Sequence, residues 1–198
     1  IRICLVGSEM CIRDRFPLAG VHLQGMAASE AIKMFLDQRP DERWVLLGEH
    51  AAQGDDQLWT AWIQATRNEL RGTMVARTVD AEFLRYLAGT HHISEAFARA
   101  GVKDEQENAW ILHLPLAEGR ANDLGHLQPI ASSTGAFEEH HRSLVQSLKW
   151  ALNGNNISYS IEGARLLGVD FEGWSDDRQI ESLVAHVLMA DDQSSSHR

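Results

Sequence analysis

The chain has 198 residues, of which 44% are hydrophobic and 23% charged, values that suit a single domain with a buried core. Its formal net charge of −10 argues against wrapping duplex DNA, whose phosphates are bound by Lys and Arg. No apolar run approaches the roughly 20 residues of a membrane-spanning helix, so we expect no membrane partner.

The first fifteen residues are excluded from the fold prediction. Residues 5–14 read Leu-Val-Gly-Ser-Glu-Met-Cys-Ile-Arg-Asp, which is the translation of a widely used transposase sequencing adapter, and we interpret residues 1–15 as adapter rather than native sequence. The alternative is a natural first strand at Ile3–Val6. Without this segment the chain loses three basic and two acidic residues, its net charge becomes −11, and both cysteines, Cys4 and Cys11, disappear. A native part without cysteine fits a cytoplasmic protein.

The first elements expected in chain order are a helix, a strand and a second helix. The helix covers Ala27–Gln38 and ends before Pro40. The apolar run Trp44–Gly48 predicts a buried strand. The second helix runs from about Asp56 to Arg71, carries an apolar stripe at helical spacing, and ends at Gly72.

Two short helices and the clearest strand come next. One helix starts near Asp80 and ends at Gly89, and the other covers Ile93–Ala100. The run Ala109–Pro115 predicts a strand, and Leu127–Ala131 is a weaker strand candidate.

The last third is expected to be helical, with helices at Phe137–Leu152, Ile161–Leu167 and Asp176–Met189. The final residues, Asp191–Arg198, predict a disordered tail. A few strands with helices between and after them indicate the α+β class. We therefore predict a single small domain over residues 16–190, in which several packed helices cover a few-stranded sheet.

The chain carries no phosphate-binding glycine loop, zinc-protease motif or serine-hydrolase motif. We accordingly predict a protein that is not an enzyme and that needs no cofactor and no metal. The alternative is an unrelated α+β enzyme in which a histidine meets a carboxylate in a deep pocket. The histidines considered for that role are His50, His91 and His140.

Two acidic pairs, Asp55-Asp56 and Glu138-Glu139, could supply such carboxylates. Acidic residues are also favoured at helix N-termini by the helix dipole, and this explanation accounts for both pairs without catalysis. We expect His141 to lie at the boundary of the core.

The most informative segment runs from Ala61 to Gly101. It combines small residues on one helix face with the run Arg77-Thr-Val-Asp-Ala-Glu-Phe-Leu-Arg-Tyr-Leu-Ala-Gly-Thr-His-His-Ile-Ser-Glu-Ala-Phe-Ala-Arg-Ala-Gly101. Glu82 is expected in the first turn of its helix, near the helix dipole or Arg77. Gly89 and Gly101 fit left-handed helix ends.

Taken together, these residues resemble the kinase-binding subunit of the KEOPS (EKC) complex, in its archaeal form. The resemblance implies a non-catalytic regulatory subunit that binds and activates an atypical small protein kinase with ATPase activity. It also implies a contact with the CCA sequence at the tRNA 3′ end, in support of threonylcarbamoyl-adenosine synthesis by another subunit. A third possibility is a general RNA-binding module without a kinase partner.

The two contacts predict two sets of side chains. A kinase-facing surface should be an apolar ridge, whose candidates are Ile93, Phe97, Ala100, Ile180, Leu183, Val187 and Leu188; the alternative for each is a place in the core. A CCA contact needs a local basic patch, whose candidates are Arg67, Arg71, Arg77, Arg85 and Lys103; the alternative is an ordinary solvated charged face.

Overall fold

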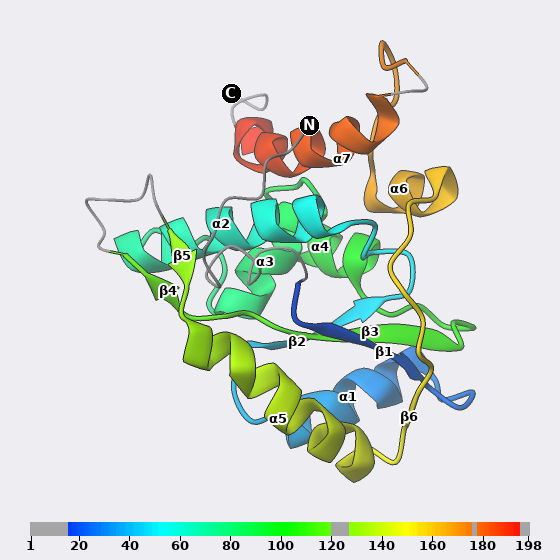
Figure 1. The fold of residues 1–198 in the computed structure, drawn as a ribbon. Helices are drawn as coiled ribbons and strands as arrows, with labels where there is room; N and C mark the ends of the chain where they lie inside the picture. Colours follow the sequence, from blue (N-terminus) through cyan, green and yellow to red (C-terminus); the bar gives the residue numbers. More distant parts are fainter. Residues whose placement is uncertain (1–15, 120–126, 176–177, 195–198) are drawn as a thin grey trace, which may run out of the picture.

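The computed structural model describes residues 16–119, 127–175 and 178–194. The predictions made for residues 1–15, including the possible strand at Ile3–Val6, lie outside these ranges. The described part is an α+β domain, as predicted from the sequence (Figure 1).

Four strands form one antiparallel sheet in the order β2-β3-β1-β6. Central strand β3 places Leu112 opposite Leu18 of β1 and Trp110 opposite Leu47 of β2. A second sheet pairs β4 with β5. The strands are β1 Leu18–His22, β2 Trp44–Gly48, β3 Asn108–His113, β4 Ala117–Glu118, β5 Gln128–Pro129 and β6 Ala151–Leu152.

Helices cover both faces of the four-stranded sheet (Figure 1). Helices α1 and α5 lie on one face, α2 and α3 lie on the other with α4 beside them, and α6 and α7 form an outer layer over that second group. The helices are α1 Ala28–Gln38, α2 Asp55–Arg71, α3 Val79–Leu87, α4 Ile93–Ala100, α5 Ala131–Ser147, α6 Ile161–Leu167 and α7 Gln179–Leu188.

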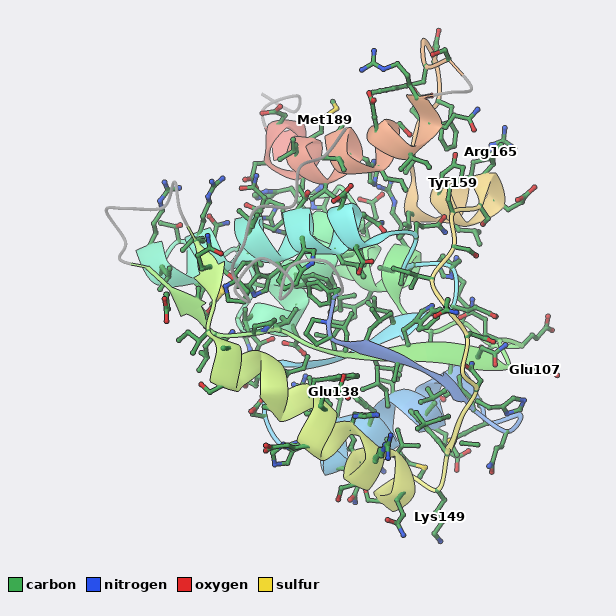
Figure 2. The ribbon with its side chains drawn as sticks, viewed as in Figure 1. Glu107, Glu138, Lys149, Tyr159, Arg165 and Met189 are labelled. Carbon is green, nitrogen blue, oxygen red and sulfur yellow. The ribbon has the colours of Figure 1, made fainter. Side chains whose placement is uncertain are left out.

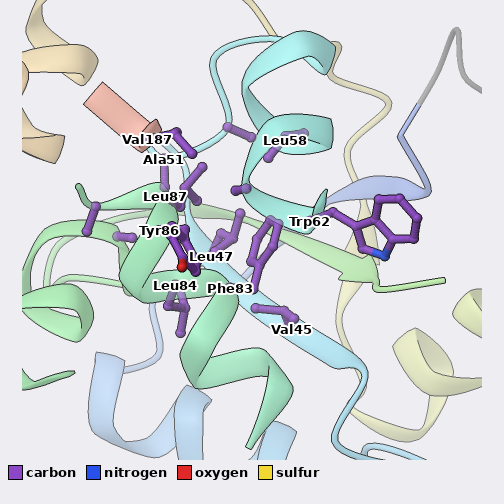
Figure 3. Packing of buried hydrophobic residues seen from close by; sticks show 14 of the residues in the cluster. Val45, Leu47, Ala51, Leu58, Trp62, Phe83, Leu84, Tyr86, Leu87 and Val187 are labelled. Carbon is purple, nitrogen blue, oxygen red and sulfur yellow. The ribbon is translucent and has the colours of Figure 1, made fainter. Parts of the chain in front are cut away.

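Strand β2 is buried throughout and β3 almost throughout, which explains why both read as continuous apolar runs rather than alternating ones. The larger core cluster joins the sheet to α2, α3 and α7, and its packing is visible around Leu47, Trp62, Phe83 and Val187 (Figure 3). Every residue of α3 is buried, so this helix is the centre of that layer.

The predicted helix Phe137–Leu152 is wrong at both ends. Helix α5 begins six residues earlier, at Ala131, and ends at Ser147. Lys149 has a φ of 58°, which breaks the helical backbone before Gly154 is reached. Ala151 and Leu152 instead pair with His22 and Val21 as β6.

Three smaller expectations also change. The candidate strand Leu127–Ala131 is a strand only at Gln128–Pro129, because Ala131 already belongs to α5. Strand β1 was not predicted, since its five residues include Gly20 and show only a weak pattern. Gly101 has a φ of −73° rather than a left-handed conformation, and an added Cβ would lie 2.5 Å from the Phe97 carbonyl oxygen.

The predicted tail is ordered further than expected. Residues Met189–Ser194 form a short 3-10 helix after α7. Its Asp191 accepts a hydrogen bond of 2.7 Å from the Tyr86 hydroxyl and forms an ion pair of 2.9 Å with Arg85. The prediction of disorder from residue 191 is therefore wrong up to Ser194. The segment has no apolar side chain to hold it, but the contacts of Asp191 with Arg85 and Tyr86 attach it to α3.

Candidate functional site

Helix α7 has two apolar stripes. Leu183 and Val187 point into the larger core cluster with 1% and 0% exposure. On the other side Ile180 is 60% and Leu188 50% exposed, with half-buried Val184 between them at helical spacing. We call Ile180, Val184 and Leu188 the outer stripe. Met189, which is 55% exposed, continues it beyond the end of the helix.

The predicted kinase-facing set is therefore divided between surface and core. Ala100, Leu183 and Val187 are buried in the core, which was the alternative to a kinase-facing position for each of them. Ile93 is half-buried and Phe97, one turn later on α4, is 49% exposed. Val184 and Met189 were missed because the spacing of α7 shows two stripes, and only the packing decides which one faces outward.

Helix α7 is held against α3 at a glycine. Gly89 has a φ of +56°, and an added Cβ would lie 2.4 Å from the ring of His186. A side chain at this position would both strain the backbone and push α7 away. This close approach explains the glycine at position 89, and it holds α7 with the outer stripe facing solvent.

A buried ion pair holds α3 to the loop that precedes it. Glu82 and Arg85 are both fully buried and lie 2.8 Å apart. Glu82 also accepts hydrogen bonds from the backbone N–H groups of Val75 and Ala76 at 3.1 and 2.9 Å, and from the Asn68 amide at 2.8 Å. Burial alone raises the pKa of Glu82, but the hydrogen bond from Arg85, together with those from Ala76 and Asn68, outweighs burial and holds this pKa below the ordinary value.

This arrangement corrects two expectations. The partner of Glu82 is Arg85 and not Arg77, which is exposed. Arg85 also leaves the RNA-binding set, because its fully buried side chain is bound by Glu82 and Asp191. The position of Arg85 in the sequence did not show whether this arginine is buried in the structure or lies on the surface.

The other basic candidates do not form a single patch. Arg71 and Arg77 are exposed at the end of α2 and in the loop after it, and Arg67 is half-buried one turn earlier. Lys103 lies shortly before the start of β3. The end of α2 lies near the other end of this strand, because Glu69 of α2 forms an ion pair with Arg43, and Arg43 donates to the Leu114 carbonyl just after β3. The length of β3, about 20 Å at 3.3 Å per residue, separates the two positions.

Of the three histidines proposed for catalysis, His50 and His140 contact backbone or amide groups, whereas the buried Nδ1 of His91 has no hydrogen-bond partner among the described residues. His50 contacts the Arg99 carbonyl at 2.6 Å and the Gln106 amide at 3.0 Å. His140 is exposed and contacts the Ala136 carbonyl of its own helix. Among the residues that the structure describes, no hydrogen bond joins a histidine to a carboxylate, and no group of three or more His, Cys, Asp and Glu is placed to hold a metal ion.

The acidic pairs have different positions. Asp55 and Asp56 lie in the first turn of α2, as expected from the helix dipole. Glu138 and Glu139 lie in the interior of α5, so the dipole explanation is wrong for them. His141 is 7% exposed and its ring stacks on Phe137 at 4.6 Å, which confirms its place at the core boundary.

One buried histidine, His113, and two half-buried ones, His50 and His186, predict an acid-sensitive fold. Burial lowers the pKa of His50, His113 and His186 below the ordinary value of 6.5. The unfolded chain therefore binds protons that the folded chain does not, so stability is complete above about pH 6.5 and declines as the pH falls toward the lowered values. Urea unfolding between about pH 7.5 and 5 should show this decline. The variant His113→Phe should make the slope shallower, and an unchanged slope would contradict the assignment.

In the described ranges no helix is both long and apolar enough to cross a lipid bilayer. The molecule combines an α+β core with an apolar helix face left in solvent, a combination typical of protein-binding domains. The family described as Kinase binding protein CGI-121 matches residues 27–160, more than half of the chain, and the chain belongs to this family. No curated protein shows significant sequence similarity to it.

Proposed function

We propose that this protein is a non-catalytic regulatory subunit that binds and activates the atypical small kinase of the KEOPS complex in the cytoplasm. The family membership supports the kinase as partner. The observation that carries the proposal is the outer stripe of α7, where Ile180 and Leu188 are 60% and 50% exposed although the inner side of the same helix is fully packed. Isolated exposed apolar residues need no explanation, but a stripe along one helix face fits docking to a groove.

Activation follows from binding only if the bound form of the kinase is the more active one. The test is the ATPase rate of the kinase, measured alone and with increasing amounts of this protein. We expect a saturable increase together with a joint peak on gel filtration. An unchanged rate and separate peaks would contradict the proposal.

We further propose that the subunit helps to recruit tRNA through its CCA end, as a step toward threonylcarbamoyl-adenosine. Arg71 and Arg77 support this proposal because both are exposed and close in sequence around the turn at Gly72. Exposed Val75 stands between them in the chain and adds an apolar surface for bases. Arg67, half-buried on the same helix, remains a candidate neighbour.

The double variant Arg71→Glu/Arg77→Glu should weaken tRNA binding by about tenfold or more and flatten its dependence on salt, because phosphate contacts are lost. Fluorescence anisotropy with intact tRNA gives both quantities. Each single variant, Arg71→Glu and Arg77→Glu, should weaken binding in the same direction. Arg142→Glu, the same charge change as either single variant at an exposed position of α5, is their matched control and should leave binding nearly unchanged.

The same measurement with tRNA that lacks its CCA end separates two functions. The proposed role requires much weaker binding of the shortened tRNA. Equal binding of both forms, together with no effect of the kinase, would instead favour a general RNA-binding module.

A further inference from the structure

Strand β1 has one open edge. The backbone N–H and C=O groups of its odd-numbered residues point toward β3. The hydrogen bonds at its two ends show this, because the Pro17 carbonyl accepts from the His113 N–H and the Leu23 N–H donates to the Glu107 carbonyl. The N–H and C=O of Leu18 therefore point the other way. On that side β6 pairs only with Val21 and His22, and Gly20 O accepts from Asn153 N–H. No described residue forms a hydrogen bond with the backbone of Leu18 on this side.

A cleft of about 490 Å³ lies along this open edge. Its walls come from Phe16 and from β1 residues Leu18–Gly20, from α5 and the start of α2. The connector at residues 154–157, which runs from β6 toward α6, forms a further wall (Figure 1). This volume is within the range of specific ligand sites. The site is separate from the outer stripe, because α5 and α7 lie on opposite sides of the sheet (Figure 1).

One buried side chain presents an unused acceptor to the cleft. His141 lines it and is 7% exposed. Its Nδ1 lies 2.8 Å from the Phe137 carbonyl oxygen, and because a carbonyl only accepts, Nδ1 carries the proton. When the ring carries this single proton, Nε2 is an acceptor, and no described residue donates to it.

The charged groups of the cleft are all acidic. Glu138 lines it from α5, at the side next to the sheet (Figure 2), and Asp55 lines it from α2. Asp55 uses one oxygen to accept the Phe16 N–H at 2.7 Å. No Lys or Arg lines the cleft among the described residues. Two carboxylates and a histidine acceptor favour a ligand that is cationic and rich in hydrogen-bond donors.

We propose that this cleft binds an extended peptide segment of a partner protein, which adds a strand to the open edge of β1 and places an arginine against Glu138 and His141. Strand addition uses the backbone groups of Leu18. Side chains of β1 alternate between the two faces of the sheet. Ala19 packs in the core cluster that contains α5, whereas Phe16 and Leu18 pack in the cluster that contains α2. An arginine on the α5 side of the added strand therefore reaches Glu138 and Nε2 of His141, and its planar group offers several donors to both.

The test uses the whole chain labelled with nitrogen-15 and a capped pentapeptide, Thr-Val-Arg-Val-Thr. We expect saturable chemical-shift changes at Leu18, Gly20 and His141. Glu138→Gln should weaken binding about three- to tenfold, in line with the loss of a charge-assisted hydrogen bond. Glu139→Gln, an exposed neighbour on α5 that does not line the cleft, should bind as the unchanged protein does.

Two further peptides test the backbone pairing. Alternate N–H groups of an added strand face β1, so N-methylation at arginine and at the following valine should have opposite results: one peptide loses binding and the other keeps it. Equal behaviour of the two, equal binding of a peptide with glutamate in place of arginine, or a cleft already filled by another part of the same chain would overturn the proposal. Leu188→Glu should retain peptide binding, which keeps this test independent of the kinase contact.

Discussion

Replacing Glu82 with alanine is expected to lower the free energy of unfolding by about 3–5 kcal/mol, the usual cost of leaving one member of a buried ion pair without its partner. Arg85 would stay fully buried with only Asp191 as a counter-charge, and Asp191 is 56% exposed. The N–H groups of Val75 and Ala76 would lose their acceptor at the same time. Urea unfolding followed by circular dichroism measures the change.

The matched control is the exposed pair Arg178–Glu181, whose atoms lie 2.5 Å apart with both side chains more than half exposed. Glu181→Ala should change stability by less than about 1 kcal/mol, because solvent screens such a pair. Similar losses for the two variants would contradict a structural role of Glu82. The lowered pKa of Glu82 adds a second expectation: its contribution is present above its unfolded pKa of about 4.5 and fades as the pH falls below that value.

Replacing Leu188 with glutamate is expected to weaken kinase binding by about thirtyfold or more while leaving the fold intact. Leu188 is 50% exposed, so a charge there stays in solvent in the free protein. In a complex the carboxylate would be buried without a partner, and central interface positions of this kind often account for 2 kcal/mol or more, a loss of about thirtyfold in affinity. Calorimetric titration of the kinase measures it.

Leu36→Glu is the control for this variant. Leu36 is also 50% exposed, but it lies on α1, on the other face of the sheet (Figure 1). Both variants should unfold at nearly the same urea concentration as the unchanged protein. A loss of kinase binding in Leu36→Glu alone would place the interface on the α1 face and contradict the proposed surface.

The elements that were predicted well are those with a strong periodic pattern and a clear stop. Helix α2 was predicted to within one residue at its start, and its end at Gly72 is confirmed by a left-handed φ of 67°. Strand β2 matches its prediction. In these elements local preference and tertiary packing favour the same conformation, so the sequence pattern is sufficient.

The elements that were missed depend on partners far away in the chain. Strand β6 has two residues and exists because Ala151 and Leu152 pair with β1, which no local pattern reveals. Arg85 lies beside Arg77 and Arg71 in the sequence but is buried by Asp191, 106 residues further along. The cleft beside β1 combines Asp55, Glu138 and His141 from separate elements.

The outer stripe is an intermediate case. The apolar positions of α7 were visible in the sequence, and Ile180 and Leu188 were named as kinase-facing candidates together with Leu183 and Val187. Helical spacing alone cannot decide which of two stripes is buried. The contact between His186 and Gly89 makes that choice, because it sets the rotation of α7 on α3.

The most direct measurement is an isothermal titration of the small kinase with this protein. Our account predicts saturable one-to-one binding with a negative heat-capacity change, the mark of apolar surface buried on association. The unchanged protein and Leu36→Glu should bind the kinase with similar affinity, and Leu188→Glu should bind it about thirtyfold or more weakly. No binding by the unchanged protein, or equal binding by Leu188→Glu, would contradict the account.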